Sequence, residues 1–308
     1  MPIMKPLYPP QQLRFLLALH ARKELSSDHL HHLQAMKKGA DGEIRWTTLL
    51  SELPDDIPIL YDLNLEINQS IIQLDALCIL QNKIVIFEIK NFSGNYTLVG
   101  DQWLSPSKKE MKSPLIQIKR NEPLIHQFLK RYQLPIPFEY HLIFVNPKFI
   151  LYGAKPNESI IFPGQIPQYL DSLKKQTISP TLLHTKIIET LLNNHKNKLN
   201  MLVKPEYHYE ELAKGVFCSK CCGRMERLSK KRFKCKKCSH SGFVNDIILN
   251  NIKDYSILFP ERKIKTLDMY EWIGKQVSTA IIHRILQKNA KRLGNGRATY
   301  YELINSYF

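Results

Sequence analysis

The sequence predicts an α/β protein that also carries a small metal-stabilised module, and three observations support this prediction. Two apolar runs, 70–80 (SIIQLDALCIL) and 83–92 (KIVIFEIKNF), alternate their side chains as neighbouring β-strands do. Segments with the apolar spacing of helices lie before and after these runs. Five of the six cysteines lie between Cys218 and Cys238, which is typical of a metal site rather than a disulfide framework.

The composition favours a polyanionic partner. The chain has 308 residues, 44% of them hydrophobic, which is enough to bury the cores of two or three domains. Its 44 Lys and Arg residues outnumber 28 Asp and Glu residues, and the net charge of +16 favours nucleic acid, with an anionic membrane surface well behind. No apolar run approaches the roughly 20 residues that span a bilayer. We therefore expect a cytoplasmic protein.

The residues before the first strand are predicted to be helical. LRFLLALH (13–20) and HLHHLQAMKK (29–38) are separated by SSD (26–28), which suits a helix N-cap. After GADGE (39–43), the apolar spacing predicts a new helix with Glu43 in its first turn, where the helix dipole favours an anion. Glu43 is therefore a candidate carboxylate for a nearby cation.

Strand 83–92 carries two charges on an apolar face. Glu88 and Lys90 are two residues apart, so they share the face of Ile84 and Ile86. A pair of charges on a buried face either neutralises itself or holds a ligand.

The preceding strand adds a second carboxylate if the turn has the right length. A two-residue loop at 81–82 places Asp75 opposite Glu88 and Gln73 opposite Lys90, all on one face. A three-residue loop would move Asp75 to the other face. Facing carboxylates repel unless a cation lies between them, and Mg²⁺ or Mn²⁺ with a lysine that orients water would suit phosphodiester hydrolysis. The alternative is a structural network in which Lys90 neutralises Asp75 and Glu88.

A further helix is predicted within SPLIQIKRNEPLIHQFL (113–129), with one apolar side. Gln117, Lys119 and Arg120 lie near its start, where they could meet a phosphate backbone. A solvated helix face is the alternative for these three side chains.

Taken in order, these residues resemble the nuclease-related (NERD) domain, which is assigned to the PD-(D/E)XK nuclease superfamily. The resemblance is carried by Gly39-x-x-Gly42-Glu43, Gln73-Leu74-Asp75, Phe87-Glu88-Ile89-Lys90-Asn91-Phe92-x-Gly94, Trp103 and Pro114-x-x-Gln117. It covers residues 37–150 and implies a mixed central sheet flanked by helices. It also implies an active site of Asp75, Glu88 and Lys90, with Glu43 as the helix carboxylate and Gln73 and Gln117 at motif positions. Leu74 replaces the proline that often precedes the aspartate, and such folds also host non-catalytic relatives.

The cysteines form the most specific motif. Cys218-x-x-Cys221 and Cys235-x-x-Cys238 can surround one tetrahedral Zn²⁺ as a closed, structural site, which resembles a zinc ribbon. Cys222 stands where glycine is common in such modules, so we expect it to lie outside the ligand set.

The zinc ribbon is basic and contains aromatic residues. Such a hairpin suits a phosphate backbone, and its aromatic rings could stack on unpaired bases or form its small core. The aromatic residues are Phe217, Phe233 and Phe243, and the candidate nucleic-acid contacts are Lys230, Lys231, Arg232 and Lys236.

The last segment predicts a helix-turn-helix-like module. A helix near 267–273, a turn at Gly274 and a second helix with outward-facing Arg284 and Lys288 are followed by a turn at 294–296 and a strand, like a small wing. A helical cap with a solvated basic face is the alternative.

These motifs divide the chain into an N-terminal helical segment, the nuclease-like domain, a helical connector, the zinc ribbon and the terminal module (1–36, 37–150, 151–213, 214–243 and 244–308). We expect a metal-dependent nuclease with DNA favoured over RNA as its substrate, and a homodimer would suit an enzyme that cuts both strands of a duplex. An enzyme directed at RNA shares these sequence features. The alternative is a nucleic-acid-binding adaptor that retains the fold without cleavage.

Overall fold

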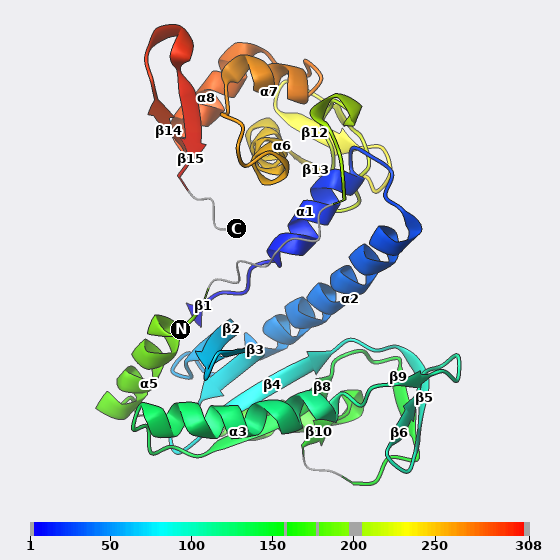
Figure 1. The fold of residues 1–308 in the computed structure, drawn as a ribbon, viewed down its shortest axis with the longest axis vertical. Helices are drawn as coiled ribbons and strands as arrows, with labels where there is room; N and C mark the ends of the chain where they lie inside the picture. Colours follow the sequence, from blue (N-terminus) through cyan, green and yellow to red (C-terminus); the bar gives the residue numbers. More distant parts are fainter. Residues whose placement is uncertain (1–2, 157–158, 177–178, 197–204, 305–308) are drawn as a thin grey trace. The chain divides into compact units, whose positions relative to one another are not determined.

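The computed structural model describes residues 3–156, 159–176, 179–196 and 205–304 (Figure 1). The chain forms two compact units. Unit 1 contains Met1–Tyr8 and Lys37–Leu199, and unit 2 contains Pro9–Met36 and Asn200–Phe308. The N-terminal helical segment predicted from the sequence is therefore grouped mainly with residues 200–308. No helix among the described residues is both long enough and apolar enough to cross a membrane.

Unit 1 is built on a mixed central sheet, as the sequence predicted. Its strand order is β1-β2-β3-β4-β8-β10. The pairs β2/β3 and β3/β4 are antiparallel, and the pairs β1/β2, β4/β8 and β8/β10 are parallel. The strands are β1 (Ile3–Lys5), β2 (Ile59–Ile67), β3 (Ser70–Ile79), β4 (Ile84–Lys90), β8 (Phe138–Phe144) and β10 (Ile160–Ile161).

Helices cover both faces of this sheet, because its strands are apolar on both sides. One face packs against α3 and α5, and the other against α2 and α4 (Figure 1). Ile84 and Ile86 of β4 belong to the first core, whereas Val85 and Phe87 belong to the second. The helices are α2 (Ser27–Leu50), α3 (Leu115–Arg131), α4 (Ile166–Lys174) and α5 (Leu182–Asn193).

A second, smaller sheet follows β4. Its order is β7-β6-β5-β9, and the buried Trp103 of β6 stacks on Phe144 at the end of β8, so the two sheets share one core. The strands are β5 (Gly94–Val99), β6 (Gln102–Leu104), β7 (Glu110–Met111) and β9 (Phe149–Tyr152).

The helix predicted to begin near Ile44 does not begin there, and this corrects the sequence analysis. Helix α2 runs without interruption from Ser27 to Leu50, so Glu43 lies well inside it and gains nothing from an N-terminal dipole. Gly42 is retained inside the helix for a tertiary reason. A Cβ there would lie 2.6 Å from Cβ of Asn91, so only glycine lets α2 approach the end of β4 this closely.

Unit 2 consists of helices, the cysteine-containing hairpins and a terminal hairpin. Helix α1 packs against α6. Helices α7 and α8 are followed by the antiparallel pair β14/β15, of which the sequence predicted only the final strand. Three short 3₁₀ turns, Pro163–Gln165, Tyr209–Glu211 and Gly296–Ala298, complete the described elements of both units. The elements of unit 2 are α1 (Gln11–His20), β11 (Met225–Arg227), β12 (Arg232–Cys235), β13 (Ser241–Phe243), α6 (Val244–Leu258), α7 (Thr266–Trp272), α8 (Thr279–Asn289), β14 (Ala290–Leu293) and β15 (Tyr300–Leu303).

Arg22 lies at the centre of unit 2 and is only 3% exposed. Its guanidinium lies 3.6 Å from the ring centroid of Trp272 and donates to the Ala213 carbonyl at 2.9 Å and to Oδ1 of Asn251 at 3.0 Å. Burial lowers the Arg22 pKa to about 9, although the nearby Asp254 opposes this shift. One buried cation thus connects the segment after α1 to α6 and α7.

Candidate active site

The loop between β3 and β4 has two residues, so the predicted register is confirmed. Leu80 donates its N–H to the Lys83 carbonyl at 2.9 Å, and Ile79 pairs with Ile84. The pairing ends at Ala76 and Phe87, one position before Asp75 and Glu88 would face each other. The two strands separate there, because β4 continues along β8 while β3 continues along β2.

The Asp75 side chain binds β4 at the point where the backbone pairing between β3 and β4 ends. Its Oδ2 accepts the N–H of Ile89 at 2.8 Å, which fixes the carboxylate between the separating strands. Burial raises the Asp75 pKa well above its usual value, and the negative charges of Glu88 and Glu43 raise it further. The Ile89 N–H and Lys90 only partly oppose this shift. The Ile89 N–H and the Lys90 ammonium therefore stabilise the ionised form of Asp75 only in part.

Glu88 is 1% exposed and is held by three side chains. Its Oε1 lies 2.6 Å from Nζ of Lys90, and its Oε2 accepts Nε2 of Gln117 at 2.7 Å and the hydroxyl of Tyr140 at 3.4 Å. Burial raises the Glu88 pKa despite the opposing effects of Lys90, Tyr140 and Gln117. Gln117 also accepts from Lys90 at 3.3 Å, so one amide orients both members of the ion pair.

Glu43 reaches the same site from α2. Its pKa is raised to about 7 by burial first and then by Asp62 and Glu88, while Lys90 opposes the shift. Helix α2 is held in place by Asn91, whose Nδ2 donates to the Lys38 carbonyl at 2.8 Å, and by Arg45, whose Nη1 donates to the Val145 carbonyl at 3.4 Å. Glu43 belongs to the site, although the reason given by the sequence analysis was wrong.

Asp62 is a member of this acidic group that the sequence analysis missed. It lies in the middle of β2 with a left-handed φ of 47°, and the pairing skips it between Tyr61 and Leu63. Lys5 compensates by donating to the Asp62 carbonyl at 2.8 Å, with its Nζ 3.8 Å from Oδ2. Non-glycine residues in this conformation cluster at functional sites. No sequence signal identified it, since an aspartate in an apolar strand is not unusual by itself.

Gln73 lies near the site but not opposite Lys90 as expected. Because the β3/β4 ladder ends at Ala76, Gln73 pairs with Asn64 of β2 instead, and its Nε2 donates to Oδ1 of Asp62 at 2.9 Å. Gln73 therefore orients the Asp62 carboxylate rather than the Lys90 ammonium.

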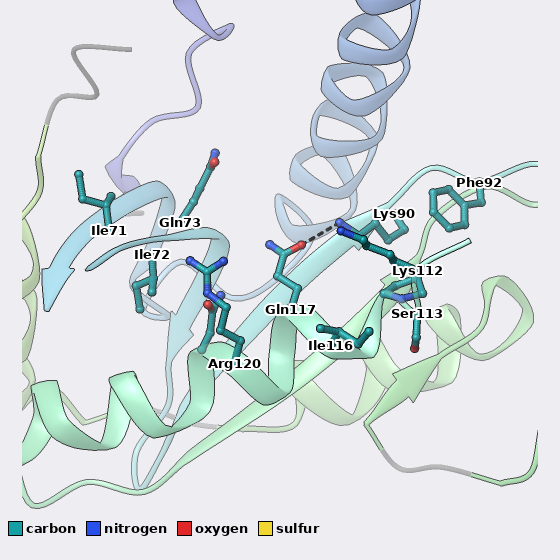
Figure 2. A pocket seen from close by; sticks show the side chains of 12 residues that line it. Ile71, Ile72, Gln73, Lys90, Phe92, Lys112, Ser113, Ile116, Gln117 and Arg120 are labelled. Carbon is teal, nitrogen blue, oxygen red and sulfur yellow. Dashed lines mark hydrogen bonds between the residues drawn. The ribbon is translucent and has the colours of Figure 1, made fainter. Parts of the chain in front are cut away.

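An open pocket of about 560 Å³ lies beside this group of side chains and is lined by residues that contact the carboxylates. Lys90, Gln117 and Gln73 line it, together with the cations Lys112 and Arg120. Figure 2 shows Gln117 between Arg120 on one side and Lys90 on the other, with its hydrogen bond to Lys90 drawn as a dashed line. Lys119, the other cation predicted on α3, is exposed but is not part of the lining.

The residues present suit a divalent cation. Glu43, Asp75 and Glu88 offer only oxygen atoms, and burial, the largest cause of the raised pKa of each, makes a nearby cation favourable for their ionised forms. Among the described residues, however, only four cysteines have ligand atoms that all lie within 4.8 Å of one another. The three carboxylates would therefore hold a cation only with their oxygen atoms closer together than they lie in this structure.

Those four cysteines are Cys218, Cys221, Cys235 and Cys238, as predicted. They lie at the ends of a three-stranded antiparallel sheet, β11-β12-β13, in an arrangement compatible with a zinc ribbon. Cys222 lies outside the cluster with a φ of 59°, and its Sγ lies 3.6 Å from the Leu17 carbonyl.

The basic and aromatic residues of the ribbon have separate roles in the fold. Phe217 and Phe233 are 6% and 0% exposed and form its core, whereas Phe243 is 58% exposed. Lys236 pairs with Glu226 at 2.9 Å. The other predicted contacts, Lys230, Lys231, Arg232, Arg284 and Lys288, remain candidates, and the first two meet Arg284 in one groove.

The outward face of α8 matches the prediction. Arg284 and Lys288 are exposed, while Ile282, Ile285 and Leu286 are buried. Two helices, the turn between them and a following hairpin are present, whereas the helix-turn-helix-like module and its role in nucleic-acid binding stay predictions.

Comparison with known proteins assigns a family to part of the chain. Residues 38–145 match the family model of the nuclease-related domain, NERD. The curated proteins and the solved structures contain no significant match to the chain. The matched range includes Glu43, Asp75, Glu88, Lys90 and Gln117, which the fold brings together. Residues 38–145 therefore match the nuclease-related domain family, NERD, and they lie within the mixed α/β fold of unit 1.

Proposed function

We propose that the protein is a metal-dependent nuclease that hydrolyses phosphodiester bonds in nucleic acid, with DNA as the expected substrate. The observation that carries this proposal is the electrostatic coupling of Glu43, Asp75 and Glu88 with Lys90, whose side chain lines a pocket of a domain that matches the nuclease-related family. A purely structural ion pair would need one carboxylate for one lysine. Three under-compensated carboxylates indicate a place for additional positive charge.

In this proposal Asp75, Glu88 and Glu43 would hold Mg²⁺ or Mn²⁺, which supplies Lewis-acid activation of water and of the scissile phosphate. Lys90 positions the attacking water and stabilises the negative charge that develops on the phosphate oxygens. Gln117 keeps the Lys90 ammonium and the Glu88 carboxylate oriented, because its amide contacts both at 3.3 Å and 2.7 Å. Lys90 and Gln117 therefore act as a unit.

The rim of the pocket supports a nucleic-acid substrate. Lys112 and Arg120 line it together with Lys90, so a phosphate backbone would meet three cations there. The net charge of +16 extends this attraction over the chain. In our proposal the zinc ribbon and the terminal module deliver the substrate, and two copies of the chain act together when both strands of a duplex are cut.

The test is cleavage of labelled single- and double-stranded DNA and RNA by the full chain, with no divalent metal, with Mg²⁺ and with Mn²⁺. The metal should be omitted rather than chelated, because a chelator would also compete for the zinc expected at the cysteines. The variants are Asp75→Asn, which can still accept the Ile89 N–H, and Lys90→Gln. The control is Lys83→Gln at the other end of β4, which removes a similar pair, Lys83 with Glu139 at 2.7 Å.

The expected result is metal-dependent cleavage whose rate falls by at least about 10²-fold in both variants and is retained in the control. This is the size of effect expected when one group that stabilises the transition state is removed. Binding of the substrate should persist in all variants. Tight binding without cleavage under any metal would instead establish the adaptor function and leave Glu88 and Lys90 as a structural pair.

A further inference from the structure

A second groove, in unit 2, combines positive charge with an exposed aromatic ring. Its volume is about 450 Å³, within the roughly 300–1,000 Å³ of small-ligand sites. The turn before β12, the start of α6 and the outer face of α8 contribute to it. The residues that matter are Lys230, Lys231, Phe243, Asp246, Ile281 and Arg284.

Phe243 is the unusual residue of this groove. It is 58% exposed, whereas the other two phenylalanines of the ribbon are 6% and 0% exposed, so it is not needed for the core of this small module. Its backbone is fixed, because it pairs with Arg232 in the sheet and directly precedes α6. The Arg232 guanidinium lies 5.1 Å from its ring centroid and is itself held by Oγ of Ser241 at 2.9 Å.

The charge of the groove is unbalanced. Lys230, Lys231 and Arg284 are exposed, and within the part of the chain that the structure describes none of them forms an ion pair. Asp246 is the acid of the lining, and it lies in the first turn of α6, where the helix dipole stabilises it. Three unpaired cations beside one acid favour a polyanion.

We propose that this groove binds an unpaired nucleotide of single-stranded nucleic acid, with the base stacked on Phe243 and the flanking phosphates on Lys230, Lys231 and Arg284. In a duplex the faces of the bases are covered by their neighbours, so a ring in a groove can stack only on a base outside the helix. Without Phe243, the three cations of the groove would suit single-stranded and duplex nucleic acid alike. The proposal rests on the proposed nuclease function for its ligand, and it adds a preference for single strands.

The test measures binding, not cleavage. Fluorescence anisotropy of the full, zinc-loaded chain is measured without Mg²⁺ or Mn²⁺, using a labelled single-stranded oligonucleotide and a duplex of the same sequence. Phe243→Leu keeps an apolar side chain but removes the aromatic face, and Phe243→Tyr restores it. Leu267→Ala is the control, because Leu267 is 69% exposed on α7 and does not line the groove.

Stacking of one base predicts that Phe243→Leu weakens single-strand binding roughly 5- to 150-fold, with duplex binding unchanged. Phe243→Tyr and the control should bind like the wild type. Replacing Lys230, Lys231 and Arg284 together by glutamine should weaken binding of both the single strand and the duplex. For the single strand, the slope of log K against log salt should also fall by about 0.7 for each phosphate contact that is lost.

Two results would overturn the proposal. One is single-strand binding that Phe243→Leu leaves unchanged or weakens only as much as duplex binding. The other is single-strand binding and salt dependence that the triple glutamine variant leaves unchanged, which would place the three cations outside the interface. Failure of cleavage in the nuclease test would leave both measurements intact, so the two proposals can fail separately.

Discussion

Replacement of Glu43 by glutamine should make the nuclease-related domain more stable in the absence of divalent metal, in contrast to most substitutions of buried residues. Burial, Asp62 and Glu88 raise the Glu43 pKa from 4.5 to about 7. A protonated glutamate has no unfavourable charge in this site, whereas an ionised one does. The folded protein therefore retains a proton near neutral pH that the unfolded chain has already released.

The sign and the size follow from this shift. Because the Glu43 pKa is raised in the folded state, the contribution of Glu43 to the free energy of unfolding is fully present below pH 4.5. This contribution is lost as the pH rises through about 7. A shift of this size corresponds to about 3 kcal/mol, at 1.36 kcal/mol for each pH unit. Glutamine does not ionise, so Glu43→Gln should exceed the wild type by up to about 3 kcal/mol at pH 8 and by little at pH 4.5.

The assay is urea unfolding of both proteins at acidic pH and at pH 8, without and with Mg²⁺. Hydrogen exchange of the β4 amides at pH 8 would assign the change to unit 1. Mg²⁺ should stabilise the wild type more than the variant, because the variant lacks one carboxylate. The control is Glu52→Gln, which removes an exposed pair with Lys174 and should change stability by less than about 1 kcal/mol. A Glu43→Gln protein less stable than the wild type at pH 8 would refute the reasoning.

The other predictions concern the remaining groups of the two units. Gln117→Leu should lower cleavage by about 10²-fold with binding retained, because the Lys90 ammonium loses its orientation, and single-turnover kinetics would show this. Cys221→Ser should reduce bound zinc below one per chain by metal analysis and lower the unfolding temperature of unit 2; unchanged zinc content would exclude the four-cysteine site. Arg22→Met should destabilise unit 2 by about 3–5 kcal/mol in urea unfolding, because the acceptors and the ring that it contacts lose their partner. Arg120→Gln should reduce the slope of log K against log salt by about 0.9 for duplex DNA if this side chain binds a phosphate, and an unchanged slope would place it outside the interface.

Local patterns predicted much of the fold and part of the site. Alternation along 83–92 assigned Glu88 and Lys90 to one face, and the two residues between the strands set the register that points Asp75 toward them. The spacing of the cysteines identified all four members of their cluster. These predictions hold because they depend on short separations along the chain, where the geometry of a strand or a tight turn leaves few alternatives.

Errors arose where a tertiary contact outweighed a local preference. The apolar spacing after 39–43 predicted a new helix with Glu43 in its first turn, whereas one helix runs through this segment. The helix continues because Gly42 lets it approach Asn91, and this contact places Glu43 at the site from inside α2. The orientation of Gln73 was misjudged for a similar reason, because the two strands separate before they reach it.

The sequence by itself determined the strand pair, its charged face and the two cysteine pairs, because each depends on residues close together in the chain. Only the tertiary structure decided that Asp62 faces the acids of the site with a left-handed backbone, and that Lys231, Phe243 and Arg284 line one groove. Those positions depend on the packing of segments that are far apart in the chain. No periodicity or spacing encodes such contacts, since they are set by how strands, helices and hairpins bury their apolar faces against one another.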